Sequence, residues 1–398
     1  EMCIRDRAYG FRDQLQDAAA LLCLDERPLK HQIIRACRHQ FEEGDAMHWW
    51  HDGFGGRADE GIRSRSSDDF LWLVFAVCEY IEKTNDFTFL QRKIAYLKAP
   101  PLEEHEDEKL ISAVCSERKE SVYMHCVRAL EHGYKTGPHG LILFGSGDWN
   151  DGMNRVSGES VWTTMFYIFI SERFCNISKK LGDEAAAEKY TLISSELRNA
   201  VEKSCYEDNR YIRAVFPDGR MLGSSKNKEC CADILPQAFA SMCDGFDKSR
   251  VMTALTTAEK MLVDKENKIV KLFTPPLKDL DAGYVSGYLE GIRENGGQYT
   301  HAAVWLALGF FKNGQYEKAF DILDMLNPVN HSKTLSDVQK YRVEPYVLSA
   351  DIYSNPAHTG MGGWSWYTGA AGWYFKVVTE NLLGLKRIGN KLYINPEL

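Results

Sequence analysis

Apolar residues recur along most of the chain at the spacing of amphipathic helices. This spacing predicts helices at 27–43, 68–83, 120–136, 160–181, 185–205, 231–243, 247–263, 300–325 and 369–384. Long connections rich in Gly, Trp, His and charge separate them, notably 44–67, 138–159, 264–299 and 354–369. They are far longer than the usual connection of about 4–6 residues, and long loops of this kind commonly carry function.

The chain is predicted to form one helical domain over residues 8–384. No Pro- or Ser-rich linker, sequence repeat or low-complexity tract interrupts it. Paired inner and outer helices in a double ring would place the loops of all inner helices at one end, so that distant motifs meet in one pocket. The expected fold class is therefore all-α.

The two ends of the chain depart from this helical pattern. Residues 1–7, EMCIRDR, begin without Met directly before the motif at 9–17, and we expect them to be foreign to the protein or disordered. Residues 385–398 include a strand-like alternation at 392–394. They are predicted to start a truncated C-terminal β-domain.

Charge and cysteine usage exclude several classes of function. The net charge of −8 opposes nucleic-acid binding, which needs clustered basic residues. No apolar run reaches the roughly 18 residues of a spanning helix, so we expect a cytoplasmic protein without membrane contact. The 11 cysteines are irregularly spaced, as expected for reduced thiols, and no zinc-binding pattern is present. No metal is therefore predicted.

The stretch HGLILFGSGDWNDGMN, at 139–154, is the most specific motif. It places Asp148, Trp149, Asn150 and Asp151 after two glycines. A tryptophan offers a flat apolar face for a pyranose ring, and its low polarity raises the pKa of a neighbouring carboxyl so that it can act as a general acid. An Asx-rich turn that caps the next helix is the alternative interpretation, and the motif alone leaves both open.

A second motif, YGFRDQLQD, carries Arg12 and Asp17 at the start of an expected helix. Paired Arg and Asp can hold vicinal sugar hydroxyls by charge-assisted hydrogen bonds, although acidic residues also favour any helix start. Glu294 and Glu344 are further loop carboxylates that could act as bases, with structural ion pairs as the alternative. Other charged and aromatic residues could form either a substrate rim or packing and helix caps: His48, Trp49, Trp50, His51, Arg63, Arg65, Asp68 and Asp69.

Two motifs at expected helix starts are candidates for an anion site. Arg293 and His301 lie in GIRENGGQYTH, where the free amides of a helix start could also face an anion. Thr368 and Gly369, in GGWSWYTG, offer a hydroxyl and an amide as donors. Two such starts could share one phosphate, and ordinary helix capping is the alternative for each.

Taken together, these motifs resemble the cellobiose and chitobiose phosphorylases of glycoside hydrolase family 94. The motifs YGFRDQLQD, QFEEGDAMHWWH, SDDFLWL, HGLILFGSGDWNDGMN, GESVW, RENGGQYTHAAVW, LNPVNH, YRVEPYV and GGWSWYTGAAGW follow the order of that family and extend from Tyr9 to about Trp373. Within the family the chain is most similar to 1,2-β-oligoglucan phosphorylases and the C-terminal phosphorylase-like domain of cyclic β-1,2-glucan synthases. The resemblance implies an (α/α)6 barrel, usually found as a homodimer.

The resemblance also implies roles for particular residues. Asp151 would be the general acid. Arg12, Asp17, Trp149, Tyr288 and Glu294 would bind the sugar, and Arg293, His301, Thr368 and Gly369 would bind phosphate. Arg293 replaces a Lys that is common in cellobiose phosphorylases, which keeps the charge but changes its geometry.

The reaction implied is reversible, inverting phosphorolysis of a β-linked gluco-oligosaccharide, with β-1,2-glucan expected as substrate. Asp151 would protonate the glycosidic oxygen while phosphate attacks the anomeric carbon from the opposite face, which gives α-D-glucose 1-phosphate and a shortened saccharide. Phosphate is then a co-substrate, and no cofactor is expected. Two alternatives remain: an inverting hydrolase with Glu294 or Glu344 as base, and a non-catalytic glucan-binding domain of a larger synthase.

Overall fold

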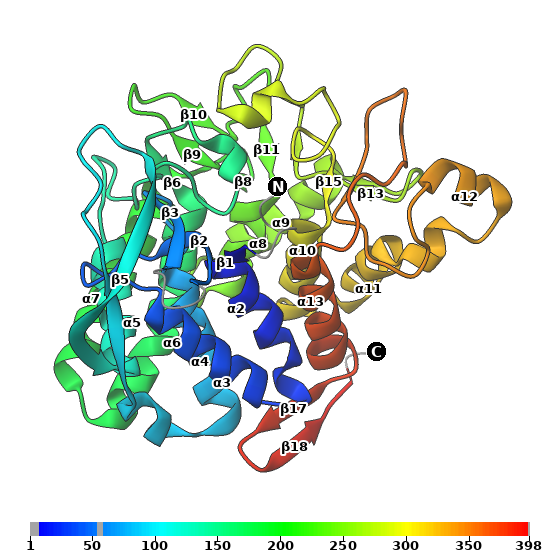
Figure 1. Cartoon of the computed structure of the whole chain (residues 1–398). Coiled ribbons are helices and arrows are strands. Elements are labelled where there is room, and N and C mark those ends of the chain that lie inside the picture. Colours follow the sequence, from blue (N-terminus) through cyan, green and yellow to red (C-terminus); the bar gives the residue numbers. More distant parts are fainter. Residues whose placement is uncertain (1–7, 54–58, 397–398) are drawn as a thin grey trace.

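The computed structural model describes residues 8–53 and 59–396 (Figure 1). The predicted foreign segment at 1–7 lies outside these residues. The helices are α2 (Phe11–Ala20), α3 (Arg27–Arg38), α4 (Leu71–Thr84), α5 (Val122–Gly133), α6 (Val161–Leu181), α7 (Glu184–Ser204), α8 (Ile234–Met242), α9 (Lys248–Leu262), α10 (Thr300–Lys312), α11 (Tyr316–Leu326), α12 (Leu335–Tyr341) and α13 (Thr368–Val377).

Helices α2, α4, α6, α8, α10 and α13 contact one another in cyclic order. Helices α3, α5, α7, α9 and α11 each pack against the ring helix that precedes them in the chain. Burial follows this division: α10 is buried continuously over 300–311, whereas α7 buries only one stripe of side chains. The helix-rich prediction is confirmed, and the starts of the ring helices carry the motifs described below.

Aromatic side chains fill the inside of the ring. Trp305 of α10 is fully buried and stacks with Trp72 of α4 and Trp162 of α6 at ring-centroid distances of 6.3 and 6.2 Å. Phe239 of α8 meets Trp305 edge-on at 4.9 Å. One side chain thus joins three other ring helices, and aromatic pairs favour such offset-stacked and edge-on geometries.

Two predicted helices are divided in the structure. The segment 300–325 forms α10 and α11, because Gly314 adopts a left-handed φ of 69° between them, a conformation that glycine adopts at little cost. The segment 369–384 begins as α13 but continues as a π-helix, η6, at Val378–Leu382. Apolar spacing persists through both breaks, which explains why the sequence pattern did not reveal them.

The all-α prediction is wrong in one region, where an antiparallel five-stranded sheet stands beside the helices. Its strand order is β1-β2-β3-β5-β4. The strands are β1 (Tyr9–Gly10), β2 (Met47–His51), β3 (Asp59–Ser64), β4 (Lys93–Lys98) and β5 (Glu108–Ser121). In β5 the buried Ile111 and Ala113 alternate with exposed neighbours, which is the period of a strand with one buried face. Part of the predicted loop at 44–67 therefore belongs to this sheet.

Short two-residue strands join the remaining loops in antiparallel pairs. They are β6 (Glu159–Ser160), β7 (Tyr206–Glu207), β8 (Arg210–Tyr211), β9 (Ala214–Val215), β10 (Met221–Leu222), β11 (Ala232–Asp233), β12 (Val263–Asp264), β13 (Ile269–Val270), β14 (Phe273–Thr274), β15 (Gln298–Tyr299) and β16 (Asp351–Ile352). Several lie directly before a ring helix and so fix where it begins.

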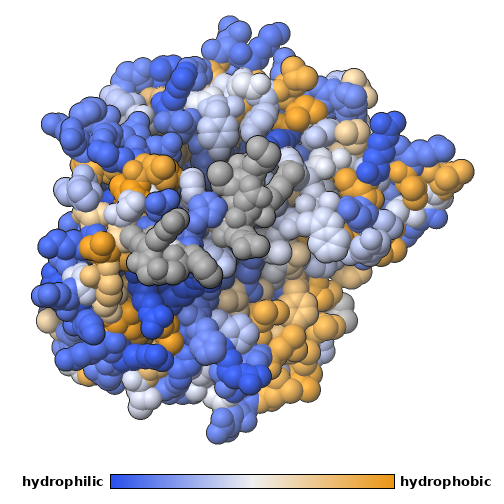
Figure 2. Space-filling view, in the orientation of Figure 1, coloured by the Kyte–Doolittle hydropathy of each residue, from blue (hydrophilic) through white to orange (hydrophobic). Residues whose placement is uncertain are grey.

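At the C-terminal end, β17 (Leu385–Ile388) and β18 (Lys391–Ile394) pair as an antiparallel hairpin. This confirms the predicted strand, while its role as the start of a β-domain stays a prediction. Figure 2 shows apolar side chains gathered over the region where Figure 1 places α13 and this hairpin, and exposed members include Phe375, Ile388 and Leu392. Among the described residues, no helix combines the length and apolar character needed to cross a bilayer.

Candidate active site

The predicted site residues come together at the starts of four ring helices. Arg12 lies in the first turn of α2, and Asp68 lies three residues before α4. His301 lies in the first turn of α10, and Thr368 begins α13. Arg12 contacts Asp68 and also Asp151, which belongs to the DWND loop. Thr368 contacts Asp17 of α2. Residues hundreds of positions apart thus meet at one end of the helical ring (Figure 1).

Arg12 is the central cation of this cluster. Its Nη1 donates to Asp68 Oδ1 at 2.9 Å and to the Asp148 carbonyl at 3.1 Å, and its Nη2 donates to Asp151 Oδ2. Burial lowers the pKa of Arg12, but the surrounding carboxylates Asp151, Asp68 and Asp69 outweigh that effect and raise it. The guanidinium therefore remains charged, and its positive charge offsets the repulsion among the three carboxylates.

The DWND motif forms the Asx-rich turn that was one interpretation of its sequence, and the general-acid role stays a prediction. Asp148 is fully buried and accepts hydrogen bonds from the Asn150 amide at 3.0 Å and the Ser160 hydroxyl at 2.7 Å. Asn150 in turn caps the short 3-10 helix η3 (Asp151–Met153) by accepting from the Gly152 amide at 3.1 Å. The side chain of Asp151, by contrast, is 40% exposed, so a substrate can reach it. Asp148 and Asn150 build the turn that presents Asp151.

Trp149 of this loop packs against the start of α10. Its side chain is largely buried and meets Tyr299, His301 and Trp305 at centroid distances of 5.4, 5.3 and 5.2 Å. Tyr288 lies farther out, with the Arg293 guanidinium 5.1 Å from its ring centre. Each of the two aromatic residues predicted to line a sugar path thus contacts one of the anion candidates, and their sugar contacts stay predictions.

His301, Gly369 and Thr368 form the second half of the cluster. A Cβ atom on Gly369 would lie 3.2 Å from His301 Nδ1, which shows how closely α13 approaches α10. Burial and the nearby Arg12 charge lower the pKa of His301 to about 3, so the ring is neutral at ordinary pH. Within the described residues, its buried Nε2 has no hydrogen-bond partner. A neutral ring with one available nitrogen can donate to an anion or accept from a hydroxyl.

Thr368 and Asp17 were predicted for different ligands, yet they contact each other. The Thr368 hydroxyl donates to Asp17 Oδ2. Burial raises the pKa of Asp17 to about 6, and the Thr368 bond opposes part of that rise. A residue predicted to bind the sugar and a residue predicted to bind phosphate are therefore in direct contact.

Glu294 and Glu344, the two candidate bases, differ in their surroundings. Burial raises the pKa of Glu294, Arg293 opposes this from 3.4 Å, and the negative charges of Asp351 and Asp151 add to the rise. Glu344 is half-buried, and hydrogen bonds from Ser365 and from Trp366 Nε1, the latter at 3.0 Å, lower its pKa. Only Glu294 therefore stands within the electrostatic reach of Asp151.

The structure also adds residues whose role the sequence left undecided. His48 Nδ1 lies 2.7 Å from Asp69 Oδ2. Burial lowers the pKa of His48, but Asp69 outweighs it and the result is about 9. Burial likewise raises the pKa of Asp68, against the attraction of Arg12. The two aspartates could have been found from the sequence Ser-Asp-Asp at 67–69, just before an apolar helix. That pattern fits helix-capping residues as well as a charged cluster, so it did not decide between them.

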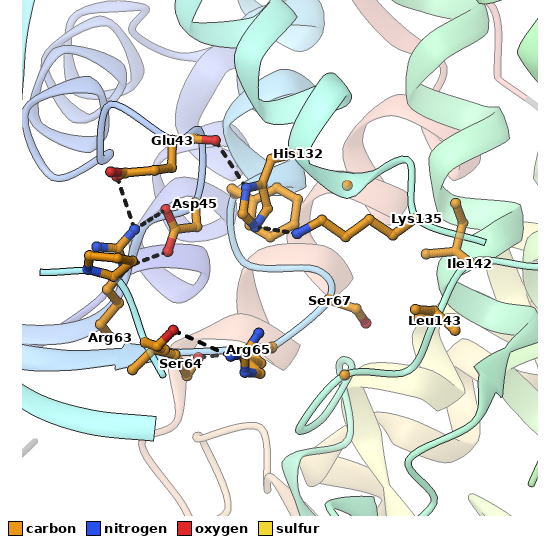
Figure 3. A pocket seen from close by; sticks show the side chains of 16 residues that line it. Glu43, Asp45, Arg63, Ser64, Arg65, Ser67, His132, Lys135, Ile142 and Leu143 are labelled. Carbon is orange, nitrogen blue, oxygen red and sulfur yellow. Dashed lines mark hydrogen bonds and ion pairs between the residues drawn. The ribbon is translucent and has the colours of Figure 1, made fainter. Parts of the chain in front are cut away.

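Arg63 and Arg65, grouped with these aspartates in the sequence, have a different role. Arg63 is buried and donates to Asp45 at 2.7 Å and to Glu43 at 3.0 Å, as Figure 3 shows. Arg65 donates to the carbonyls of Glu106 and Glu103, both at 2.7 Å. They border a hollow of about 290 Å³ and support the sheet. The substrate-rim interpretation is therefore not supported for the two arginines.

The cysteines and one group of His and Asp residues are further candidates for thiol or metal chemistry. The 10 cysteines with described positions are free. In the ranges 8–53 and 59–396, the group with metal-ligand spacing is His39, Asp52 and Asp59. Asp52 is paired with Arg35, and Asp59 with His39 at 3.1 Å. The group is thus satisfied by protein partners.

Sequence comparison relates nearly the whole chain to one family of proteins. The sequence model of the glycosyl hydrolase 94 superfamily, catalytic domain, matches residues 3–384. The chain is 40% identical to the cyclic beta-(1,2)-glucan synthase NdvB of Rhizobium meliloti, over 98% of this chain and 14% of that protein. It is 27% identical to the solabiose phosphorylase of Paenibacillus borealis, over 98% of this chain and 48% of that one.

The chain thus spans half or less of the length of these relatives. Among solved structures, a bacterial glucoamylase complexed with acarbose matches with a TM-score of 0.60 and 12% identity, over 94% of this chain and 49% of that chain. This likeness shows a shared helix-rich fold. On the match of its sequence to the family over nearly its whole length, the chain belongs to the glycosyl hydrolase 94 superfamily.

Proposed function

We propose that the chain catalyses reversible, inverting phosphorolysis of β-linked gluco-oligosaccharides, releasing α-D-glucose 1-phosphate and a shortened saccharide. The observation that carries the proposal is the position of Asp151. It is a partly exposed carboxylate held by buried Arg12, and the neighbouring Trp149 contacts His301 at the start of α10, one of two helix starts with no side-chain cap. Neither Tyr299, before α10, nor Tyr367, before α13, caps its helix. Helices α6 and α8, by contrast, are capped by Ser160 and Asp233.

Uncapped helix starts are suited to binding an anion. Their first amides have no partner within the helix, and the helix dipole adds partial positive charge there. His301 and Gly369 lie at these two starts and approach one another closely. We propose that phosphate binds between them, with Thr368 and Arg293 as further donors, in agreement with the phosphorylase among the relatives.

In the proposed mechanism Asp151 acts as the general acid. Its proton passes to the glycosidic oxygen as the bond from that oxygen to the anomeric carbon breaks. A phosphate oxygen attacks the anomeric carbon from the opposite face, so the β-linkage yields an α-phosphate. Because phosphate is already anionic, no second carboxylate is needed to activate it, unlike the water of an inverting hydrolase. Arg12, Asp17, Trp149, Tyr288 and Glu294 would hold the sugar.

The finer assignments are proposals of the same kind. The cyclic order of ring helices supports an (α/α)6 barrel. The similarity to a cyclic beta-(1,2)-glucan synthase supports β-1,2-glucan as the substrate. The mechanism requires phosphate as co-substrate and assigns no task to a metal or organic cofactor. We further propose a cytoplasmic location and the homodimer usual for the family.

The experiment compares product release from β-1,2-gluco-oligosaccharides and from cellobiose, with and without phosphate, for the wild type and Asp151→Asn. We expect phosphate-dependent glucose 1-phosphate, greater from the β-1,2-linked substrate, and loss in the variant. Glucose released without phosphate would instead support a hydrolase with Glu294 as base. Glucan binding without turnover would support a binding domain.

A further inference from the structure

Arg213 forms a fully buried ion pair behind the catalytic loop. It lies between β8 and β9, and its Nη1 and Nη2 each lie 2.6 Å from a different oxygen of Asp148. Its Nε lies 3.5 Å from Asp233 Oδ2. Burial opposes the charge on Arg213, but the two aspartates raise its pKa above the ordinary value. A charge buried this completely is tolerated because it is paired, and the two-pronged geometry also fixes the orientation of Asp148.

Asp148 connects this ion pair to the residues that we assign to the reaction. Its carboxylate accepts from the Asn150 amide, and Asn150 caps the turn that begins at Asp151. The backbone carbonyl of Asp148 accepts a hydrogen bond from Arg12 at 3.1 Å. Movement of Asp148 would therefore displace both Asp151 and Arg12. Arg213 itself has no exposed surface and cannot touch a substrate.

We propose that Arg213 is a positioning residue for the general acid. It orients Asp148, which sets the turn that aims Asp151 at the glycosidic oxygen. The inference rests on the proposed role of Asp151 but not on whether phosphate or water is the nucleophile. Displacement of a catalytic group by about 1 Å can cost roughly 100-fold in rate. Loss of the Arg213 pair should therefore weaken acid catalysis specifically.

A second buried ion pair provides a matched control. Arg173 of α6 donates from Nη2 to Glu79 of α4 at 2.7 Å. Both side chains are largely buried, and their contacts run to Glu82 and Lys376 instead of the DWND loop. Removing Arg173 also disturbs a buried ion pair, without touching the turn before Asp151.

The test compares two substrates that differ in their need for an acid. The sugar leaving group of a β-glucan must be protonated, whereas the 2,4-dinitrophenolate of an aryl β-glucoside leaves without a proton. For Arg213→Met we expect kcat on the glucan to fall about 10- to 100-fold, and kcat on the aryl glucoside to change far less. Arg213→Lys keeps the charge but not the two-pronged contact, so its kcat on the glucan should lie between those of the wild type and Arg213→Met. Arg173→Met should affect both substrates equally.

An equal loss on both substrates by Arg213→Met, or a loss on the glucan no larger than that of Arg173→Met, would overturn the proposal. If Arg213→Met does not fold, Asp148→Asn takes its place, because the amide keeps the shape and weakens the ion pair. A hydrolase would show the same substrate pattern but release glucose, so failure of the phosphorylase assignment is seen separately in the product.

Discussion

Arg12 and Asp151 are 139 residues apart in the chain and form a direct ion pair where helix α2 meets the DWND loop. The same guanidinium holds Asp68 from the start of α4. One cation, itself a sugar-binding candidate, thus joins the proposed acid and a buried aspartate. The arrangement explains how motifs that are separate in sequence operate as one site.

Arg12→Met should both destabilise the protein and abolish turnover. The variant leaves Asp68 and Asp69 buried with one cation fewer, and breaking a buried charge pair of this kind costs about 3–5 kcal/mol. Urea unfolding measures that loss. Arg27→Met is the control, because Arg27 pairs with Asp25 on the surface and should change stability little. Unaltered stability of Arg12→Met would contradict a buried cluster.

The His48–Asp69 pair should make stability depend on pH in the alkaline range. The pKa of His48 is raised from 6.5 to about 9 in the folded protein. The charged ring therefore contributes its full stabilisation below pH 6.5, and the contribution is lost as pH rises through 9. The difference in unfolding free energy between the wild type and His48→Gln should shrink across this window. A difference that stays constant from pH 6 to 9.5 would count against the ion pair.

Gly369→Ala should weaken phosphate binding more than glucan binding. The added methyl would lie 3.2 Å from His301 Nδ1 and press the start of α13 away from α10. We expect the KM for phosphate to rise by about tenfold, a loss of roughly 1.4 kcal/mol, with the KM for glucan nearly unchanged. Gly287→Ala serves as control, because its Cβ would meet no atom within 4 Å. A rise confined to the glucan KM would place phosphate elsewhere.

Thr368→Val should move the pH profile of glucan turnover. The pKa of Asp17 is about 6, and the Thr368 hydrogen bond keeps it from rising further. If ionised Asp17 holds the sugar, kcat/KM for glucan at saturating phosphate increases with pH through about 6. The variant should shift this limb to higher pH. An unshifted limb would show that Asp17 does not control the profile.

The sequence predicted the helical character and most of the residues that meet at the site, because each motif stands at a helix start or in a long loop. It did not predict the partners that hold them. Arg213 and Asp148 are 65 residues apart, and nothing local in either segment signals the other. The five-stranded sheet was missed because helices α2, α3 and α4 interrupt its strands along the chain and dominated the apolar pattern. Pairing between distant segments was the information that the sequence pattern lacked.

The configuration of the sugar phosphate tests the central claim most directly. Oligosaccharide, phosphate and protein would be followed together by NMR from the first minutes of reaction. The account predicts that glucose 1-phosphate appears as the α-anomer, that no free glucose accumulates from the cleaved unit, and that Asp151→Asn gives neither product. Appearance of the β-anomer, or of free glucose independent of phosphate, would contradict it.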